Sequence, residues 1–260
     1  MIPVALTLAG SDPSGGAGIQ ADLKTFHQRH VYGMAVITLL TVQNTRGIRQ
    51  VDILKPSWVV RQLDALLADI PPQAIKIGAL GIAEVICAVA GRSKKFNCPL
   101  VVDPVMVSKH GVSLLQKDAV RVFIKELLPR ATLVTPNLSE AAALSGIRVY
   151  DEESMEKAAE RIAGMGAEAV LVKGGHLKGA ALDLFYRNGR TKIFSASRVR
   201  TRHTHGTGCT YSAAITAELA KGKNLPEAIA IAKRFITEAI RTAPGLGKGW
   251  GPVNHHAEIR

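Results

Sequence analysis

Short apolar runs alternate along this chain with longer segments whose apolar residues recur at helical spacing. This alternation constrains the fold more than any other feature, because strands separated by helices pair in parallel. The runs are almost continuously apolar, which is typical of strands buried on both faces of a sheet. Strands are predicted at residues 4–8, 35–42, 74–77, 100–102, 132–134 and 169–172.

Helices are predicted between these strands, near residues 17–29, 56–69, 82–95, 115–128, 137–145 and 152–165. A hairpin of residues 181–187 and 191–196, turned by Asn188-Gly189, follows. Two long helices close the chain, and the last has Asn224 as its cap, Pro226 in its first turn and Pro244 beyond its end.

The pattern predicts an α/β fold with a mostly parallel central sheet between two helical layers. No linker, repeat or low-complexity stretch divides residues 1–260, so a single domain is predicted. Ligands of such sheets bind at the carboxyl ends of the strands. The residues expected at that rim are Gly10, Asp12, Gln43, Lys76 to Gly78, Asp103-Pro104, Thr135 to Asn137 and Lys173 to Gly175.

Composition and charge argue against several protein classes. The 33 basic and 21 acidic residues give a net charge of +12, but the densest basic stretch, residues 187–202, contains one aromatic residue and no nucleic-acid-binding motif. A solvated basic edge is favoured over a nucleic-acid surface. No apolar run approaches the roughly 20 residues of a membrane span, so a cytoplasmic protein is predicted.

Neither the cysteines nor the histidines have the spacing of a zinc site or a disulfide framework. Cys87 and Cys98 lie in apolar surroundings and are predicted to be inert core residues. The histidines of the pairs 203/205 and 255/256 are predicted to lie at the surface or in turns. Cys209 differs, because glycines precede it and a helix is predicted after it.

The stretch "HTHGTGCTYSAA", residues 203–214, resembles a phosphate-binding loop without its lysine. Gly206, Thr207 and Gly208 free the backbone to turn N–H groups inward, and the helix that follows adds its positive end. An anion hole for a phosphoryl group is favoured over a close helix–sheet contact. Lys173, at a neighbouring strand end, can supply the missing cation.

Cys209 has two candidate roles at this helix start. A lowered pKa would give some thiolate near neutrality, able to accept a hydroxyl proton. A nucleophile served by His203 or His205 is the alternative, but the spacing is too short for a comfortable triad. A base or polar lining residue is favoured.

Residues 16–21, GAGIQA, match the GxGxxA pattern of a dinucleotide site, but Gln43-Asn44 stands where a ribose-binding acid is needed. Asp22 is interpreted either as a ligand-binding acid or as a first-turn acid stabilised by the helix dipole.

The segment "TPNLSEA" places Asn137 and Glu140 three residues apart at a helix start. With Asp103 nearby, these oxygen ligands suit a magnesium ion that keeps most of its waters. A capping box between the same two residues is the alternative.

In order, the chain carries "AGSDPSGGAGIQADLKTF", "TVQNT", "KIGAL", "VVDPVM", "TPNLSEA", "VLVKGGH", "THGTGCT" and "GKGWGPVNHH". This ordered set resembles the ribokinase-like superfamily and, within it, the hydroxymethylpyrimidine and phosphomethylpyrimidine kinases of thiamine biosynthesis. The resemblance covers essentially the whole chain. It implies phosphorylation of 4-amino-5-hydroxymethyl-2-methylpyrimidine, and then of the monophosphate, with ATP and Mg²⁺.

The resemblance also implies roles for individual residues. Asp22 and Gln43 would bond the aminopyrimidine edge, in a pocket lined by Gly10, Val42, Ala79 and Val105. Gly206 to Cys209 would form the anion hole, and Cys209 would lie beside the reacting hydroxymethyl group. Lys173, Asn137 and Thr204 would contact ATP, and Asp103, Glu140 and Asn137 would organise magnesium.

Two departures from the family pattern bear on specificity. Ala79 stands where many relatives carry a lid methionine, and Trp250 stands where the tail often has histidine. A pyridoxal kinase on the same scaffold is therefore the nearest alternative. A dinucleotide-dependent oxidoreductase and a nucleic-acid binder are alternatives from other classes. A homodimer is compatible with the family pattern.

Overall fold

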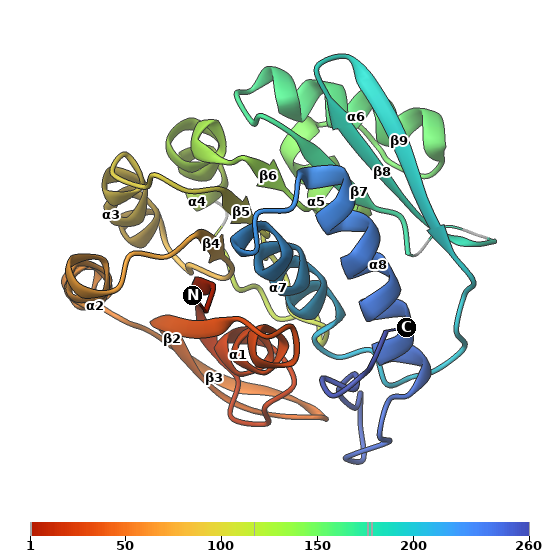
Figure 1. Cartoon of the computed structure of the whole chain (residues 1–260), viewed down its shortest axis with the longest axis horizontal. Coiled ribbons are helices and arrows are strands. Elements are labelled where there is room, and N and C mark those ends of the chain that lie inside the picture. The colour runs from red at the N-terminus through yellow and green to blue at the C-terminus, as the bar shows by residue number, and fades with distance from the viewer. Residues whose placement is uncertain (1, 117, 176, 178, 260) are drawn as a thin grey trace.

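The computed structural model describes residues 2–116, 118–175, 177 and 179–259. Its strands form one nine-stranded sheet with the order β3-β2-β1-β4-β5-β6-β7-β8-β9 (Figure 1). Strands β2, β1, β4, β5, β6 and β7 run parallel to one another. The pairs β2/β3, β7/β8 and β8/β9 are antiparallel. The predicted α/β class is confirmed.

The described elements follow one another as β1 (Val4–Ser11), α1 (Gly18–Gln28), β2 (Tyr32–Asn44), β3 (Gly47–Ile53), α2 (Pro56–Asp69), β4 (Ala74–Ile77), α3 (Ala83–Ser93), β5 (Leu100–Val102), α4 (Ala119–Val122), η1 (Phe123–Leu127), η2 (Leu128–Arg130), β6 (Leu133–Val134), α5 (Leu138–Ser145), α6 (Glu152–Gly164), β7 (Val170–Lys173), β8 (Ala181–Arg187), β9 (Arg190–Ala196), α7 (Thr207–Ala220) and α8 (Leu225–Arg241).

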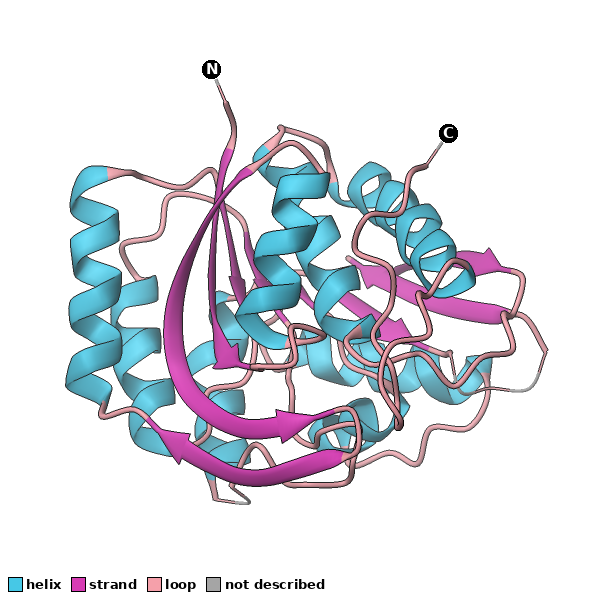
Figure 2. Cartoon of the chain, turned by 90° about the horizontal axis from the view of Figure 1, so that it is seen from below, coloured by secondary structure: helices cyan, strands magenta, loops and turns pink. Residues whose placement is uncertain are grey.

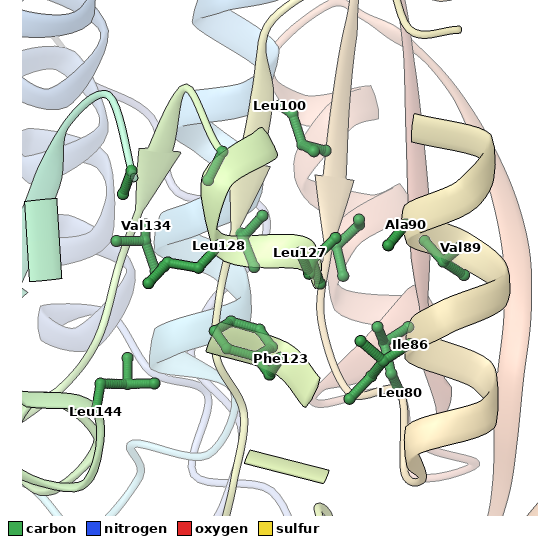
Figure 3. Close-up of a cluster of buried hydrophobic side chains, with 14 of the residues drawn as sticks. Leu80, Ile86, Val89, Ala90, Leu100, Phe123, Leu127, Leu128, Val134 and Leu144 are labelled. Atoms are coloured by element: carbon green, nitrogen blue, oxygen red, sulfur yellow. The ribbon is translucent and has the colours of Figure 1, made fainter. Parts of the chain in front are cut away.

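The central strands send alternate side chains into two hydrophobic clusters, as the period of a strand requires. In β5, Leu100 and Val102 belong to one cluster and Val101 belongs to the other. The first cluster lies under the helical layer of α2, α3, α4 and α6, and includes the side chains of Figure 3. The second lies under α1, α7 and α8. Burial on both faces explains why the strand sequences are almost continuously apolar.

Helix α7 is the most enclosed helix of this second layer. It contacts β1, β4 and β5 and packs against α1 and α8. Every residue from Thr210 to Ala220 is buried, and several are alanines that allow close approach. The carboxyl ends of the central strands therefore lie next to the N-terminus of a firmly packed helix.

Two elements differ from the sequence predictions. Strand β3 was not predicted, because Arg49, Gln50 and Asp52 give it a polar composition suited to an exposed edge. The helix predicted near residues 115–128 is a short α4 followed by the π-helical η1 and the 3₁₀ turn η2, which contains Pro129. Figure 2 shows β2 curving toward β3, and β2 is longer than predicted.

The C-terminal prediction is confirmed in detail. The Asn224 side chain accepts a hydrogen bond from the Glu227 N–H at 3.0 Å, and α8 ends at Arg241, before Pro244. The hairpin turn is also confirmed, with positive φ angles of 52° at Asn188 and 72° at Gly189. Among the described helices, none combines the length and apolar character needed to cross a bilayer.

Candidate active site

A cavity of about 770 Å³ lies where the parallel strands end. Its walls come from the carboxyl ends of β1, β2, β4, β5 and β7 and from the first turns of α5 and α7. Of the residues to which the resemblance gives a role, all except Asp22 and Val42 line this cavity. The residues that line it are Gly10, Gln43, Ala79, Asp103, Val105, Asn137, Glu140, Lys173, Thr204, Gly206, Thr207, Gly208 and Cys209.

The loop before α7 has the geometry predicted for anion binding. Gly206 is the N-cap residue with φ +78°, a left-handed conformation that favours glycine. A Cβ at Gly206 would also collide with the carbonyl oxygen of Gly16. The first N–H groups of α7 have no helical carbonyl to bond, so the start of the helix can bind an anion in the cavity.

The predicted cation lies beside this loop. Lys173 Nζ is 2.8 Å from Asp103 Oδ1, and both side chains are largely buried. A Cβ built on Gly208 would lie 3.4 Å from Lys173 Nζ and 3.5 Å from Asp103 Oδ2. The absence of a side chain at Gly208 therefore leaves the ion pair open to an anion bound at the helix start.

Cys209 does not have the pKa expected from its position. Burial raises the pKa of its thiol to about 11, and the carboxylates of Asp22 and Asp103 add to this effect while Lys76 opposes it. The prediction of a thiolate near neutrality is wrong, and Cys209 is a neutral thiol at pH 7.

Asp22 does not line the cavity, contrary to the expectation that it contacts a ligand. Its side chain is fully buried, and Oδ2 accepts hydrogen bonds from Thr7 Oγ1 at 2.6 Å and Lys76 Nζ at 2.8 Å. Burial opposes the positive charge of Lys76, but the acidic groups around it outweigh this effect and raise the pKa of the Lys76 ammonium. Lys76 lines the cavity, so the pair presents a cation rather than a carboxylate.

The other exception is Val42, which is 52% exposed on β2 and does not line the cavity. The alternation of a strand explains this, because Thr41 and Gln43 point to the opposite face and do line it.

Both interpretations of Asn137 and Glu140 are compatible with the geometry. The two residues form a capping box, with Glu140 N–H donating to Asn137 Oδ1 at 2.9 Å and Asn137 N–H to Glu140 Oε2 at 2.8 Å. Both also line the cavity. Burial raises the pKa of Glu140 to about 7, and Lys173 opposes this shift. Across the described residues, no three His, Cys, Asp or Glu side chains gather as a metal cluster.

Two of the histidines predicted at the surface or in turns, His205 and His255, are buried, and His255 does lie in a turn. His205 is 4% exposed, and its Nε2 lies 2.7 Å from Asp12 Oδ2. His255 is 5% exposed and lies 3.1 Å from Thr210 Oγ1, behind the first turn of α7. Neither position carries a periodic signal, because both lie in irregular segments that only tertiary packing encloses.

The predicted core cysteines also differ from expectation, since Cys87 is exposed and Cys98 is half-buried. Cys87 lies in α3 among apolar neighbours in the sequence, but the buried positions of that helix are Val85, Ile86, Val89 and Ala90. Cys87 therefore falls on the opposite face of the helix.

The glycines of the GxGxxA match have packing roles. Gly18 has φ +57°, and a Cβ there would collide with the carbonyl oxygen of Gly10. A Cβ on Gly16 would meet the ring of His205 at 2.5 Å. Close approach of three chain segments explains both glycines without a dinucleotide.

Sequence reasoning gave no role to a further buried ion pair that lines the cavity, in which Asp183 of β8 is the cross-strand partner of Lys173. Lys233 Nζ in α8 lies 2.6 Å from Asp183 Oδ2 in β8, and the Tyr211 ring lies beside Lys233. Ile236 and Ile240 supply apolar lining from the same helix. The cavity therefore joins the anion hole to an ion pair and apolar side chains of α8.

This architecture defines a class: an α/β enzyme that binds an anion at a helix start, beside a buried lysine, at the carboxyl ends of its strands. Such a site suits phosphoryl transfer, which depends mainly on positioning and charge stabilisation.

Comparison with known proteins identifies the family. The family model for phosphomethylpyrimidine kinase matches residues 12–254. The hydroxymethylpyrimidine/phosphomethylpyrimidine kinase of Rhizobium meliloti is 51% identical over 259 residues, which cover 98% of this chain and 97% of that protein. The chain belongs to the phosphomethylpyrimidine kinase family, and it is a kinase.

Two further relatives add context. The thiamine biosynthesis bifunctional protein ThiED of Geobacter sulfurreducens is 50% identical over 252 residues, covering 96% of this chain but only 51% of that protein. The chain thus spans about half of that relative. The ADP complex of Bacillus subtilis pyridoxal kinase superposes with a TM-score of 0.92 at 40% identity, covering 99% of this chain and 98% of the other. The ribokinase-like fold expectation is confirmed.

Proposed function

We propose that this kinase transfers the terminal phosphoryl group of ATP to 4-amino-5-hydroxymethyl-2-methylpyrimidine and then to the resulting monophosphate. The single observation that carries the proposal is the Lys173–Asp103 pair beside the Gly206–Cys209 loop, in the same cavity as the Gln43 amide. The names of the relatives support the choice of substrate, because those proteins act on this ring.

The ring would bind toward the β1, β2 and β4 side of the cavity. Gln43 can both donate to and accept from an aminopyrimidine edge. Gly10, Ala79 and Val105 supply small or apolar lining there. The hydroxymethyl group would then face Cys209, whose neutral thiol lines the site and leaves the substrate oxygen as the nucleophile.

The transferring phosphoryl group would sit on the first turn of α7, with the Lys173 ammonium beside it. Charge on the phosphoryl oxygens is stabilised by the N–H groups and by this ammonium. The loose transition state of phosphoryl transfer asks little of a base, which suits a site whose nearest thiol is neutral. The nucleotide base would lie toward α8.

The donor set fits a magnesium ion held mainly by water and phosphate oxygens. Asp103 and Glu140 are the carboxylates that line this part of the cavity, and a nearby cation would favour the ionised form of Glu140. When bound, the ion would neutralise charge on the nucleotide phosphates. Location in the cytoplasm and association as a homodimer stay predictions.

Pyridoxal is the second candidate substrate, because the Bacillus subtilis protein that shares this fold is a pyridoxal kinase. One coupled assay decides between them. Rates of ADP formation are compared with the aminopyrimidine, its monophosphate and pyridoxal, each at several concentrations. Preference for the aminopyrimidine and turnover of its monophosphate are expected. A higher kcat/KM with pyridoxal would overturn the proposed substrate.

A further inference from the structure

The Gln43 side chain is held at both ends by protein groups. One end of its amide lies 3.2 Å from His205 Nε2, and the other lies 3.2 Å from Thr41 Oγ1. The structure places the amide nitrogen at the His205 end and the oxygen at the Thr41 end. Half a turn about the last side-chain bond exchanges them, so hydrogen-bond chemistry decides which end is which.

His205 cannot accept a hydrogen bond at this contact. Its Nε2 lies 2.7 Å from Asp12 Oδ2, and Asp12 also accepts hydrogen bonds from the Ser14 N–H, the Ser14 hydroxyl and the Ala17 N–H. A carboxyl group that accepts these three hydrogen bonds is held in its ionised form and leaves the His205 nitrogen as the donor. His205 Nε2 therefore donates its one proton to Asp12 and has no lone pair left, so an amide N–H cannot face it favourably.

Thr41 imposes the complementary requirement at the other end. Its hydroxyl has one proton, which is donated to the Ser11 carbonyl oxygen at 2.9 Å. The lone pairs of Thr41 Oγ1 thus remain for Gln43, and they need a donor. Both neighbours favour the same orientation, with Gln43 Oε1 toward His205 and Nε2 toward Thr41.

We infer that His205, oriented by Asp12, and Thr41 are positioning residues that fix the direction of the Gln43 amide and thereby the hydrogen-bond polarity of ring recognition. The amide then offers the cavity an acceptor on its His205 side and a donor on its Thr41 side. This inference rests on the proposed function, in which Gln43 binds the edge of the ring.

A fixed amide selects between two kinds of heterocycle. A 4-aminopyrimidine presents a donor, its amino group, next to an acceptor, its ring nitrogen. The 4-oxo analogue presents a carbonyl acceptor next to a ring N–H donor, the reverse order. Binding the 4-oxo ring in the same place would turn the amide over and set two N–H groups against each other at His205. The site therefore prefers 4-amino to 4-oxo rings through the two residues that orient the Gln43 amide.

The test compares two probes, 4-amino-5-hydroxymethyl-2-methylpyrimidine and its 4-oxo analogue. For each enzyme, KM of the amino ring and the inhibition constant of the oxo ring against its phosphorylation are measured. The ratio of the two constants is independent of the amount of active protein, so partial misfolding does not change it. The key variants are His205→Met and Thr41→Val, which remove the polar group that fixes each end of the amide.

The matched controls are His205→Gln and Thr41→Ser, which keep a donor and a hydroxyl at the two positions. We expect the preference for the amino ring to fall about 10-fold or more in His205→Met and several-fold in Thr41→Val, and to be largely retained in both controls. If His205→Met does not fold, Thr41→Val decides in the same way.

An amino-to-oxo preference within about twofold of the wild-type value in the decisive variant overturns the inference. Failure of the oxo ring to inhibit the loosened variants overturns it as well. The proposed function fails separately, if the wild-type enzyme does not phosphorylate the amino ring at all.

Discussion

Lys173 Nζ at the end of β7 lies 2.8 Å from Oδ1 of Asp103, the residue that follows β5, so the ends of two strands separated only by β6 hold the cation of the anion hole in place. Asp103 is itself held by Ser212, whose hydroxyl lies 3.2 Å from Oδ2. The sheet and α7 together position the ammonium, which is therefore ready before a phosphate binds.

The first prediction concerns this ammonium. Lys173→Met removes the charge that stabilises the transferring phosphoryl group, and we expect kcat to fall about 10²- to 10³-fold. Lys157→Met is the matched control, since Lys157 forms an exposed pair with Glu153 far from the cavity. Steady-state kinetics on both variants check this, with thermal unfolding to confirm the fold. Near wild-type turnover in Lys173→Met would remove the lysine from the chemistry.

The second prediction follows from the neutral thiol of Cys209. Since burial raises its pKa to about 11, the thiol does not titrate between pH 6 and 9. Cys209→Ser should retain kcat within about tenfold, because a hydroxyl replaces one weak polar group by another. The pH profiles of kcat should have the same shape in both enzymes. A limb in the wild-type profile that disappears in the serine variant would show that Cys209 does act as a base.

The fold could be predicted from the sequence wherever burial is regular. The strands β1, β4, β5, β6 and β7 are buried on both faces, and their apolar runs identified them. Strand β3 was not predicted because an edge strand can carry polar residues such as Arg49, Gln50 and Asp52, so its sequence lacks the apolar pattern of a buried strand. The division of the helix predicted near residues 115–128 depends on packing around Phe123 and Leu127, and the periodicity does not record it.

The sequence predicted which residues lie at the rim of the site, but it did not predict their protonation states or their ion-pair partners. The rule that ligands meet strand ends placed Gln43, Asp103 and Lys173 correctly. The state of Cys209 depends on burial and on Asp22 and Asp103, which are distant in the sequence. The resemblance placed Asp22 at the ligand, and nothing local in the sequence indicates that Lys76, 54 residues away, occupies its carboxylate.

Asp22 provides the third prediction. Asp22→Asn leaves the fully buried ammonium of Lys76 without a charged partner, and we expect a loss of about 3–5 kcal/mol in the free energy of unfolding. Asp64→Asn is the control, because the Asp64–Arg92 pair is exposed and should leave the unfolding midpoint almost unchanged. Urea unfolding measures both. Equal small effects would mean that the Lys76–Asp22 pair contributes nothing beyond a surface ion pair.

The fourth prediction concerns pH and His255. Burial lowers the pKa of its imidazole from 6.5 to about 4, so the folded state binds fewer protons than the unfolded state between these values. Stability is then complete above pH 6.5 and is lost as the pH falls toward 4, by about 3 kcal/mol. His255→Gln should flatten this part of the stability curve, as measured by urea unfolding from pH 7 to 4. His256→Gln, which alters the exposed neighbour, should change the curve only slightly, because His256 contributes less than burial to the lowered pKa of His255. A wild-type curve that shows no fall over this range would contradict the prediction.

The last prediction separates the two glycines of the anion hole. In Gly206→Ala the alanine would have to adopt a positive φ of 78°, and its Cβ would collide with the Gly16 carbonyl oxygen. The start of α7 therefore cannot form as it does in the wild-type protein. This variant should lose stability and activity together. Gly208→Ala places a methyl group 3.4 Å from Lys173 Nζ with no backbone strain, so the protein should fold with nearly the wild-type melting temperature. Its kcat should nevertheless fall, because the methyl group occupies space next to the ammonium where the phosphoryl group would bind. If Gly208→Ala turned over normally, the phosphoryl group would have to bind elsewhere, whereas a stable and active Gly206→Ala would exclude the left-handed cap as a requirement.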